Sequence, residues 1–391
     1  MDAIANPYAM SAGNPPPALT GRDTQLEQWE VLVHRLAAGR SDQSLVVSGL
    51  RGVGKTVLLL EFQRIADRAG WITSDPIEVR SDTDFRVELA DRAFEALTHL
   101  DRRVGLGDRA RGFAKLLQGF RVGVGSDGSV EFSFDATASA ATGDLERDLT
   151  ELFVQLGEVA RQHDTGVAFF VDEMQFLRRP ELEAVAAAMH RMSQKQLPVA
   201  FAGTGLPQLP GLIVEAKSYA ERLFSYPRLD RLDVDAARAA LELPAQEQGV
   251  VFDHDALVQI LELSGRYPAF LQAYGREVWS TAPRSPITRA DVDAAAPIVQ
   301  RKLDEQFFHV RFEKATPGER RYMSAMAALG DGPQQTGQVA AKIGYRSASS
   351  SSVPRDALIK KGLIYRPEYG AVDFTVPHFA AFMRRRYPLE S

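Results

Sequence analysis

Short apolar runs alternate with amphipathic segments over the first 230 or so residues of the chain. Three runs, at 45–47, 167–171 and 197–202, are almost continuously apolar, which is typical of strands that a parallel sheet buries on both faces. The segments between them repeat apolar residues at helical spacing. We therefore expect an α/β fold over 21–232, a parallel β-sheet flanked by helices, after an extended segment at 1–20. The expected helices span 23–36, 56–69, 84–100 and 145–160, and a further strand is expected at 77–79.

After residue 232 the pattern becomes helical throughout. The spacing of apolar residues predicts four helices, and these form an all-α domain over 233–312. The stretch 307–312 is rich in aromatic residues, and we expect it to pack between domains rather than to stack bases, because no base-binding fold surrounds it. The predicted helices span 233–248, 253–264, 267–282 and 289 to about 308.

The end of the chain, 313–391, predicts a small domain of its own. Three helical segments, at 316–329, 336–343 and 347–362, precede two short alternating stretches around a turn within 362–376. This alternation is typical of a β-hairpin. Three helices and a hairpin predict a winged helix-turn-helix domain.

Residues 103–143 interrupt the α/β pattern and predict an insertion. Two apolar stretches, 120–124 and 130–134, flank Asp127 and Gly128, and Asp-Gly supplies the positive φ angles that a tight hairpin turn needs. Binding sites favour loops, but inserted loops are often only surface decoration. Contact with a substrate or partner and plain decoration therefore both stay open for this hairpin.

The composition of the chain limits the chemistry and the cellular compartment that we expect. The chain has 391 residues and no cysteine, which excludes disulfides, thiolate zinc sites and cysteine nucleophiles and fits a reducing compartment. The seven histidines lack a paired metal-ligand spacing. No apolar run approaches the roughly 18 residues that a membrane span requires, and no signal-peptide pattern opens the chain. We expect a cytoplasmic protein without membrane insertion.

Charge is unevenly distributed along the chain. Residues 316–391 hold eleven Lys/Arg and six Asp/Glu, a balance of +5, and the remaining 315 residues hold thirty-five against forty-five, a balance of −10. Such a division indicates that the C-terminal part meets something anionic. The run Arg384 to Arg386 is either a phosphate contact or a solvated end of the chain.

The strongest chemical signal follows the apolar run at 45–47. Glycines and a Lys-Thr pair have the spacing G-x4-G-K-T there and lead into a helical pattern, which is the context that a P-loop requires. The glycines allow a tight turn that points backbone N–H groups and a helix N-terminus at a polyphosphate. Lys55 is expected to reach the β- and γ-phosphates, and Thr56 to bind Mg²⁺. The predicted phosphate-binding residues are Gly49, Leu50, Arg51, Gly52, Val53, Gly54, Lys55, Thr56 and Val57.

Polar residues close two of the later apolar runs. Asp172 and Glu173 follow the run at 167–171, and Thr204 follows the run at 197–202. Ligands of α/β sheets bind at the carboxyl ends of strands. We therefore expect Asp172 to bind the Mg²⁺ shell and Glu173 to polarise the attacking water. Thr204 either senses the γ-phosphate or the water or simply ends its strand.

The order P-loop, apolar strand with Asp-Glu and apolar strand with a polar tip resembles the AAA+ ATPases and their STAND relatives. The likeness extends to origin-recognition-type initiators and archaeal-type predicted ATPases, many of which end in a winged helix. It implies ATP and Mg²⁺ as ligands, a helical lid over 233–312, and a place for Arg22 close to the adenine. It also implies that Arg222 completes the site of a neighbouring subunit in a homo-oligomer, unless it only forms a surface salt bridge.

One position departs from the pattern of the initiators. These proteins commonly carry an arginine on the lid helix that touches the γ-phosphate, whereas Pro268 stands there in this chain. STAND-type switches have proline at this place and use it to read the nucleotide state. Arg266 is either a substitute for the arginine or a solvated turn residue. Slow hydrolysis with a conformational switch is therefore as consistent with the sequence as steady turnover.

The resemblance predicts a Mg²⁺-dependent ATPase or ATP-controlled switch that couples nucleotide state to a C-terminal winged helix. If that domain binds duplex DNA, its third helix enters the major groove. The alternative is a signalling or assembly switch whose winged helix docks a protein partner, because Ser, Arg and Lys also make up an ordinary solvated face. The predicted DNA contacts are Ser349, Ser350, Arg355, Lys360, Lys361 and Arg366.

Overall fold

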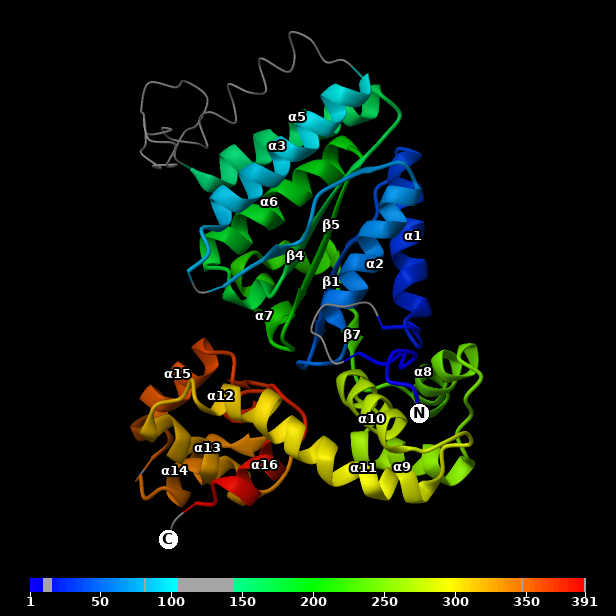
Figure 1. The fold of residues 1–391 in the computed structure, drawn as a ribbon. Helices are drawn as coiled ribbons and strands as arrows, with labels where there is room; N and C mark the ends of the chain where they lie inside the picture. Colours follow the sequence, from blue (N-terminus) through cyan, green and yellow to red (C-terminus); the bar gives the residue numbers. More distant parts are fainter. Residues whose placement is uncertain (10–15, 81, 105–143, 346, 390–391) are drawn as a thin grey trace, which may run out of the picture.

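The computed structural model describes residues 1–9, 16–80, 82–104, 144–345 and 347–389. Figure 1 shows three bodies: a sheet domain, and beneath it two helical bodies that lie side by side. We call the body from α8 to α11 the lid and the body from α13 to α16 the C-terminal module. The hairpin predicted at 103–143 falls almost entirely outside the described residues.

The sheet domain contains the strands and helices that the apolar pattern of its sequence predicts. Each expected helix occurs within a few residues of its predicted bounds, and the apolar runs form the longer strands. Its elements are α1 Asp23–Ala37, β1 Ser44–Gly49, α2 Lys55–Arg68, β2 Ile72–Thr73, β3 Ile77–Glu78, α3 Phe85–Val104, α5 Leu145–Gln162, β4 Val167–Asp172, η1 Met174–Phe176, α6 Arg179–Lys195, β5 Val199–Gly205, α7 Leu209–Ala216, η2 Ser218–Arg222, β6 Phe224–Ser225 and β7 Arg228–Leu229.

The rest of the described chain is helical except for three short strands. The lid contains α8 Val234–Glu247, α9 His254–Ser264, α10 Pro268–Thr281 and α11 Arg289–Lys302. A connector, the π-helix η3 Leu303–His309 and α12 Val310–Phe312, leads to the C-terminal module. The module contains α13 Pro317–Leu329, β8 Gln334–Gln335, α14 Thr336–Lys342, η4 Ala348–Ser351, α15 Ser352–Lys360, β9 Ile364–Tyr365, β10 Ala371–Phe374 and α16 Phe379–Arg386.

The central strands run parallel in the order β2-β4-β5-β1-β6, with β3 beside β4 and β7 beside β1, seven strands among the described residues. In the register, Val171 lies opposite Gly203, and Val47 lies opposite Thr204. The carboxyl ends of β1, β4 and β5 therefore meet at one edge of the sheet, as expected where the polar residues follow the strands. The predicted parallel sheet flanked by helices is confirmed.

Each face of the sheet has its own apolar core, because successive side chains of a strand point to opposite faces. On β4, Phe169 and Val171 pack with α3, α5 and α6, whereas Ala168 and Phe170 pack with α1 and α2. Figure 1 shows these two groups of helices on either side of the strands. Burial on both faces explains why the strand sequences are continuously apolar.

Two helices of the second half differ from the predicted ones. The helix predicted at 289–308 continues as α11, then widens into a π-helix from 303 to 309. The helix predicted at 347–362 begins as a 3-10 turn and becomes α-helical only at Ser352. Pro354 explains this, because its missing N–H and its ring are tolerated only in the first turn of an α-helix.

The lid and the C-terminal module share one continuous apolar core. It extends from Leu232 in front of the lid to Met383 on α16 and includes the connector residues Phe308 and Phe312. The stretch 307–312 thus packs between the two bodies, as predicted. In the module, β10 pairs with β9 as expected and also with β8, which makes an antiparallel sheet of three strands within the described residues.

The N-terminal segment packs on the lid rather than on the sheet domain. Tyr8 is buried in the lid core, and its hydroxyl donates to the Leu241 carbonyl. The Trp279 ring nitrogen donates to the Asp2 carbonyl at 2.8 Å. These contacts place the first residues of the chain against α8 and α10.

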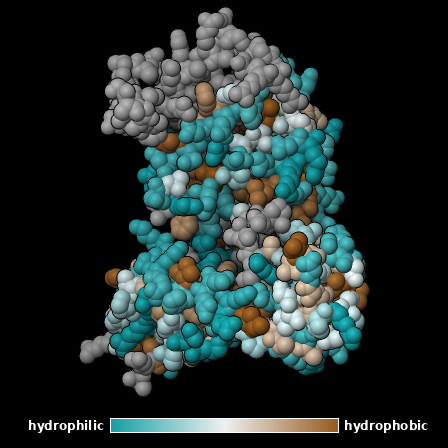
Figure 2. Space-filling model, viewed as in Figure 1, coloured by the Kyte–Doolittle hydropathy of each residue, from teal (hydrophilic) through white to brown (hydrophobic). Residues whose placement is uncertain are grey.

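The surface in Figure 2 is mostly hydrophilic, with apolar atoms scattered over the face that is drawn. Among the described helices, none combines the length and the apolar character that a bilayer crossing requires.

Candidate functional site

The P-loop connects the end of β1 to the start of α2. Gly52 and Gly54 adopt φ angles of 82° and 93°, in the left-handed region that glycine enters without a steric penalty. Gly49 has no room for a side chain, because a Cβ there would lie 2.7 Å from the Leu229 carbonyl oxygen. Three glycines of the motif are therefore required by the backbone itself.

Lys55 is buried beneath the P-loop, and its Nζ donates to the carbonyl oxygens of Gly49 and Leu50 at 2.9 Å each. Burial lowers the pKa of Lys55 to about 8, although Glu173 and Asp172 act in the opposite direction and Arg51 adds to the lowering. A partly desolvated ammonium group that only carbonyl dipoles satisfy is suited to receive phosphate oxygens.

Asp172 is the centre of a hydrogen-bond cluster at the sheet edge. Its carboxylate accepts the Thr56 hydroxyl at 2.6 Å and also accepts the Thr204 hydroxyl. It further accepts the backbone N–H of Glu173 at 2.8 Å. The structure thus brings together Thr56, Asp172 and Thr204, three residues that the sequence analysis selected from separate segments.

Glu173 lies one residue beyond β4, with a φ angle of 57°, a conformation that non-glycine residues adopt rarely and often at functional sites. Its carboxylate accepts two hydrogen bonds from the Arg51 guanidinium, at 2.9 and 3.3 Å, and one from the Gln175 amide. Arg51 and Glu173 are 23% and 17% exposed. In this conformation a bidentate ion pair therefore holds the carboxylate that was predicted to act on water.

The side-chain role of Arg51 could not be read from the sequence, because Arg51 occupies a position that the P-loop motif leaves free. Gln175 was also not predicted. Its side-chain amide N–H donates to the Glu173 carboxylate. Its side-chain amide oxygen accepts the backbone N–H of Leu206 at 2.9 Å, just past the end of β5.

Arg22 is buried against the P-loop. Its Nη2 donates to the carbonyl oxygens of Val53 at 2.9 Å and Asp230 at 3.1 Å. Burial lowers the pKa of Arg22, while Asp230 and Asp233 oppose this effect. Arg22 thus ties the start of the sheet domain to the phosphate loop and to the junction with the lid.

Both helical bodies contact the P-loop directly. The Ala269 N–H, next to Pro268 at the start of α10, donates to the Gly52 carbonyl at 3.2 Å. From the C-terminal module, the Thr375 carbonyl accepts the Arg51 N–H at 2.9 Å. A Cβ on Gly362 would come within 3.0 Å of the Arg51 guanidinium. The phosphate loop therefore lies where all three bodies meet.

Two other predicted arginines lie on η2 and in the turn before α10. Arg222 is exposed on η2, just before β6, and β6 pairs with the start of β1. This places Arg222 at the opposite end of β1 from the P-loop of its own chain, and within the described residues it forms no ion pair. Arg266 occupies a left-handed turn with a φ angle of 63° and is half-buried.

The predicted DNA contacts lie on and around α15, and several have acidic partners within the module. Arg355 and Arg366 both pair with Asp356, at 3.1 and 2.7 Å, and Lys361 pairs with Glu319 at 2.6 Å. Lys360 is exposed and has no ion pair among the described residues. The side chains of Ser349 and Ser350 both bond to the Ser347 hydroxyl.

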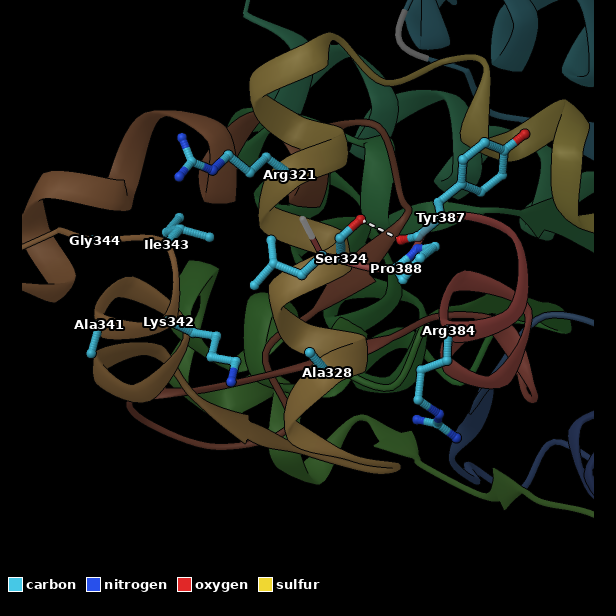
Figure 3. A pocket seen from close by; sticks show the side chains of 11 residues that line it. Arg321, Ser324, Ala328, Ala341, Lys342, Ile343, Gly344, Arg384, Tyr387 and Pro388 are labelled. Carbon is cyan, nitrogen blue, oxygen red and sulfur yellow. Dashed lines mark hydrogen bonds between the residues drawn. The ribbon is translucent and has the colours of Figure 1, made fainter. Parts of the chain in front are cut away.

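A cationic groove of about 590 Å³ lies between α13, α14 and α16. Figure 3 shows Arg321, Lys342 and Arg384 around it, with the Ser324 hydroxyl bonded to the Tyr387 carbonyl at 2.9 Å. Arg384 pairs with Asp331 at 2.8 Å, whereas Arg321 and Lys342 form no ion pair within the described part of the chain. The lining also includes the apolar side chains of Ala328, Ala341, Ile343, Pro388 and Leu389.

Comparison with known proteins agrees with this geometry. Residues 18–201 match the family model described as AAA ATPase domain, and residues 305–383 match one described as a domain of unknown function (DUF8462). A search of curated proteins finds no match. The matched residues cover most of the sheet domain, which thus resembles an AAA ATPase domain.

Solved structures share the fold over nearly the whole chain. The Walker-type ATPase of Pyrococcus abyssi is 15% identical with a TM-score of 0.57, covering 96% of this chain and 99% of that chain. The ORC2 protein of Aeropyrum pernix, in ADPNP-ADP complexes, is 13% identical with a TM-score of 0.50 and 96% coverage of each chain. The chain therefore shares the fold of these two proteins.

Proposed function

We propose that the chain binds and hydrolyses ATP in a Mg²⁺-dependent reaction at the edge of the sheet where β1, β4 and β5 end. The observation that carries this proposal is the convergence of Lys55, Thr56, Asp172 and Glu173 on one P-loop. The experiment that tests it is the release of phosphate from ATP by the purified full chain, with and without Mg²⁺. Absence of phosphate release under both conditions would contradict it.

Thr56 and Asp172 are the residues that would hold Mg²⁺. A hydroxyl and a carboxylate only 2.6 Å apart are the hard oxygen donors that this ion prefers. Mg²⁺ usually keeps few protein ligands and takes others from phosphates and water. When bound, the ion neutralises charge on the phosphates.

Glu173 would act on the attacking water as a general base, and Lys55 would stabilise the phosphate charge. The structure adds a condition, because the Glu173 carboxylate is bonded to Arg51 and Gln175. A base must lie within hydrogen-bond reach of the proton that it accepts. We therefore expect Arg51 to give up at least one of its two bonds during hydrolysis, because a carboxylate that is paired with a guanidinium is a weaker base.

Movement of Arg51 would also reach the C-terminal module. The Arg51 N–H donates to Thr375, and its guanidinium lies against Gly362. Both contacts come from the segment that follows α15. We propose that nucleotide binding at the P-loop changes these contacts and thereby the position of the module relative to the sheet domain.

We propose that the C-terminal module is a winged helix and that its displacement regulates binding to duplex DNA. Its positive balance and the exposed Lys360 on α15 support this function. Lys360→Ala is expected to weaken binding to duplexes of any sequence, and to lower the slope of log affinity against log salt by about one. Fluorescence anisotropy of the full chain on a labelled duplex, over a salt series with ATP or ADP, measures both quantities.

The matched control is Lys195→Ala on α6, which removes a lysine from the sheet domain that is paired with Glu158. This variant is expected to bind DNA like the unaltered chain. If the unaltered chain has no DNA affinity at low salt with either nucleotide, DNA is not the partner.

The cationic groove favours a second candidate, an assembly switch. We propose as its occupant an acidic surface of a second copy. Residues 1–315 carry a balance of −10, and the groove carries Arg321 and Lys342, which form no ion pair with any residue that the structure describes. Light scattering is expected to show a rise in particle mass with ATP over ADP. The double variant Arg321→Glu, Lys342→Glu is expected to abolish this rise by charge repulsion.

Arg386→Glu is the control for the groove, since Arg386 lies on α16 but does not line the groove. It is expected to leave the mass rise intact. A monomer under every nucleotide condition counts against the assembly switch and leaves DNA as the remaining candidate.

A further inference from the structure

Arg311 lies on the connector between the lid and the C-terminal module, and its side chain turns inward. Its guanidinium carbon lies 4.0 Å from the centre of the Phe307 ring, and its Nη1 donates to the Phe307 carbonyl. The preceding π-helix adds a residue to the helical turn, which changes the face on which the next side chains emerge. Arg311 is half-buried, whereas the neighbouring Val310 is exposed.

Arg311 lies close to the P-loop through its neighbour Phe307. The edge of the Phe307 ring is 3.9 Å from the place where a Cβ on Gly52 would stand. Burial and, to a smaller extent, the charge of Arg51 lower the pKa of Arg311 to about 10, although Glu173 opposes both effects. Arg311 therefore lies within electrostatic reach of both members of the Arg51–Glu173 ion pair.

Arg311 has no carboxylate partner in the part of the chain that the structure describes. In the described residues no Asp or Glu lies within ion-pair distance of its guanidinium, whereas Glu173 is already bonded to Arg51. A half-buried guanidinium beside a second arginine is destabilised by desolvation and by repulsion between like charges. An anion that enters between them removes both penalties.

We propose that Arg311 binds the γ-phosphate of ATP and thereby provides, from the connector, the positive charge that Pro268 cannot provide from the lid. This inference rests on the proposed nucleotide site. The γ-phosphate is the relevant group because Arg311 lies within electrostatic reach of Glu173, which the proposed mechanism places at the terminal phosphate. ADP lacks this phosphate, so the contact distinguishes the two nucleotides.

Through Arg311 the bound nucleotide also contacts the connector directly. Arg311 is on α12, three residues after Phe308, which packs in the core shared by the lid and the module. A phosphate that attracts Arg311 therefore exerts a force on the connector, which joins these two bodies. The loss of the γ-phosphate on hydrolysis releases that segment.

A purely structural role for Arg311 is the competing explanation, since a guanidinium over an aromatic ring stabilises a fold by itself. The chain offers a matched control for it. Arg320 lies over the Phe312 ring at 4.6 Å in the same region, but it pairs with Glu313 at 3.3 Å. It has a similar aromatic contact but a carboxylate partner of its own.

The experiment measures the affinities for ATP and ADP by calorimetry on the full chain. A Glu173→Gln background prevents turnover, and the variants compared in it are Arg311→Met, Arg311→Lys and Arg320→Met. We expect Arg311→Met to lower the affinity for ATP at least tenfold and that for ADP by less than threefold, which corresponds to one lost charge-assisted contact. Arg311→Lys restores part of the preference for ATP, and Arg320→Met leaves both affinities unchanged.

Unchanged ATP affinity in Arg311→Met overturns the inference. An equal loss for ATP and ADP, or the same loss in Arg320→Met, also overturns it, because a structural role then explains the result. Thermal unfolding of each variant identifies a folding defect. Failure of the proposed function is a separate result: a chain with intact Arg311 that binds neither nucleotide, or whose binding does not change in Lys55→Met.

Discussion

Replacing Glu173 by Gln is expected to lower the rate of ATP hydrolysis by about 10²- to 10⁴-fold, the usual contribution of a positioned general base. The amide keeps the size of the side chain and can still contact Gln175, but it cannot accept a proton from water. Single-turnover phosphate release with Mg²⁺-ATP measures the rate. ATP binding is expected to persist, because the substitution removes a negative charge near the phosphates.

The control for this variant is Glu183→Gln on α6. Glu183 pairs with Arg179 at 2.9 Å on the surface of the sheet domain, where such pairs contribute about 1 kcal/mol at most. Its hydrolysis rate is expected to equal that of the unaltered chain. If Glu173→Gln hydrolyses ATP at the unaltered rate, then Glu173 does not act on the water, and its pairing with Arg51 is structural.

Replacing Lys55 by Met is expected to raise the Kd for ATP at least about 30-fold, since the loss of one partner of a buried charged contact costs about 2–5 kcal/mol. The ammonium group is held in the loop by the Gly49 and Leu50 carbonyls, so it is already placed where the phosphates would lie. Calorimetric titration of Mg²⁺-ATP measures the change. Lys195→Met, on α6, serves as the surface control.

Lys55 also predicts how ATP affinity depends on pH. Its pKa in the unliganded chain is lowered to about 8, and bound phosphate raises it again by favouring the charged form. Below pH 8 Lys55 is protonated in both states, so its contribution to affinity is constant. Above pH 8 the unliganded chain loses this proton, and the affinity falls by up to about tenfold per pH unit as binding takes up a proton.

Lys55→Arg tests the origin of this pH dependence, because a guanidinium stays protonated throughout the range. Its ATP affinity is expected to stay level between neutral and alkaline pH, whatever its absolute value. Calorimetry in buffers of different ionisation enthalpy measures proton uptake directly. If the unaltered chain takes up no proton at alkaline pH, then Lys55 is not the group that titrates.

The elements of the sheet domain were predictable because local pattern and tertiary environment agree. Strands such as β4 are buried on both faces, and only continuously apolar sequence fits that position. The helices were predictable from the repeat of apolar residues on one face. The widening of the chain into η3 was not, because it depends on backbone geometry that apolar spacing does not determine. The later start of α15 does have a sequence signal, Pro354, but apolar spacing alone does not include it.

The residues of the candidate site also fall into two groups, those that the sequence predicted and those that it did not. Lys55, Thr56, Asp172, Glu173 and Thr204 were predicted from motifs, and the structure places them around the P-loop and the ends of β4 and β5. Arg51, Gln175 and Arg311 were missed as functional side chains, since no motif constrains their positions. For Arg222 and the α15 residues, the sequence supplied candidates whose roles depend on partners outside the single chain.

By itself the sequence determined that the chain has a P-loop, a parallel sheet and the residues of a nucleotide site, because these are set by local spacing and by burial. Only the tertiary structure decided that Arg51 pairs with Glu173 and that Thr375 of the C-terminal module hydrogen-bonds to the P-loop. It also decided that Arg311 lies near the Arg51–Glu173 ion pair. The physical reason is distance along the chain: Arg51 is separated from Glu173 and from Thr375 by more than a hundred residues. Such contacts arise when separate bodies pack together, and no local pattern records them.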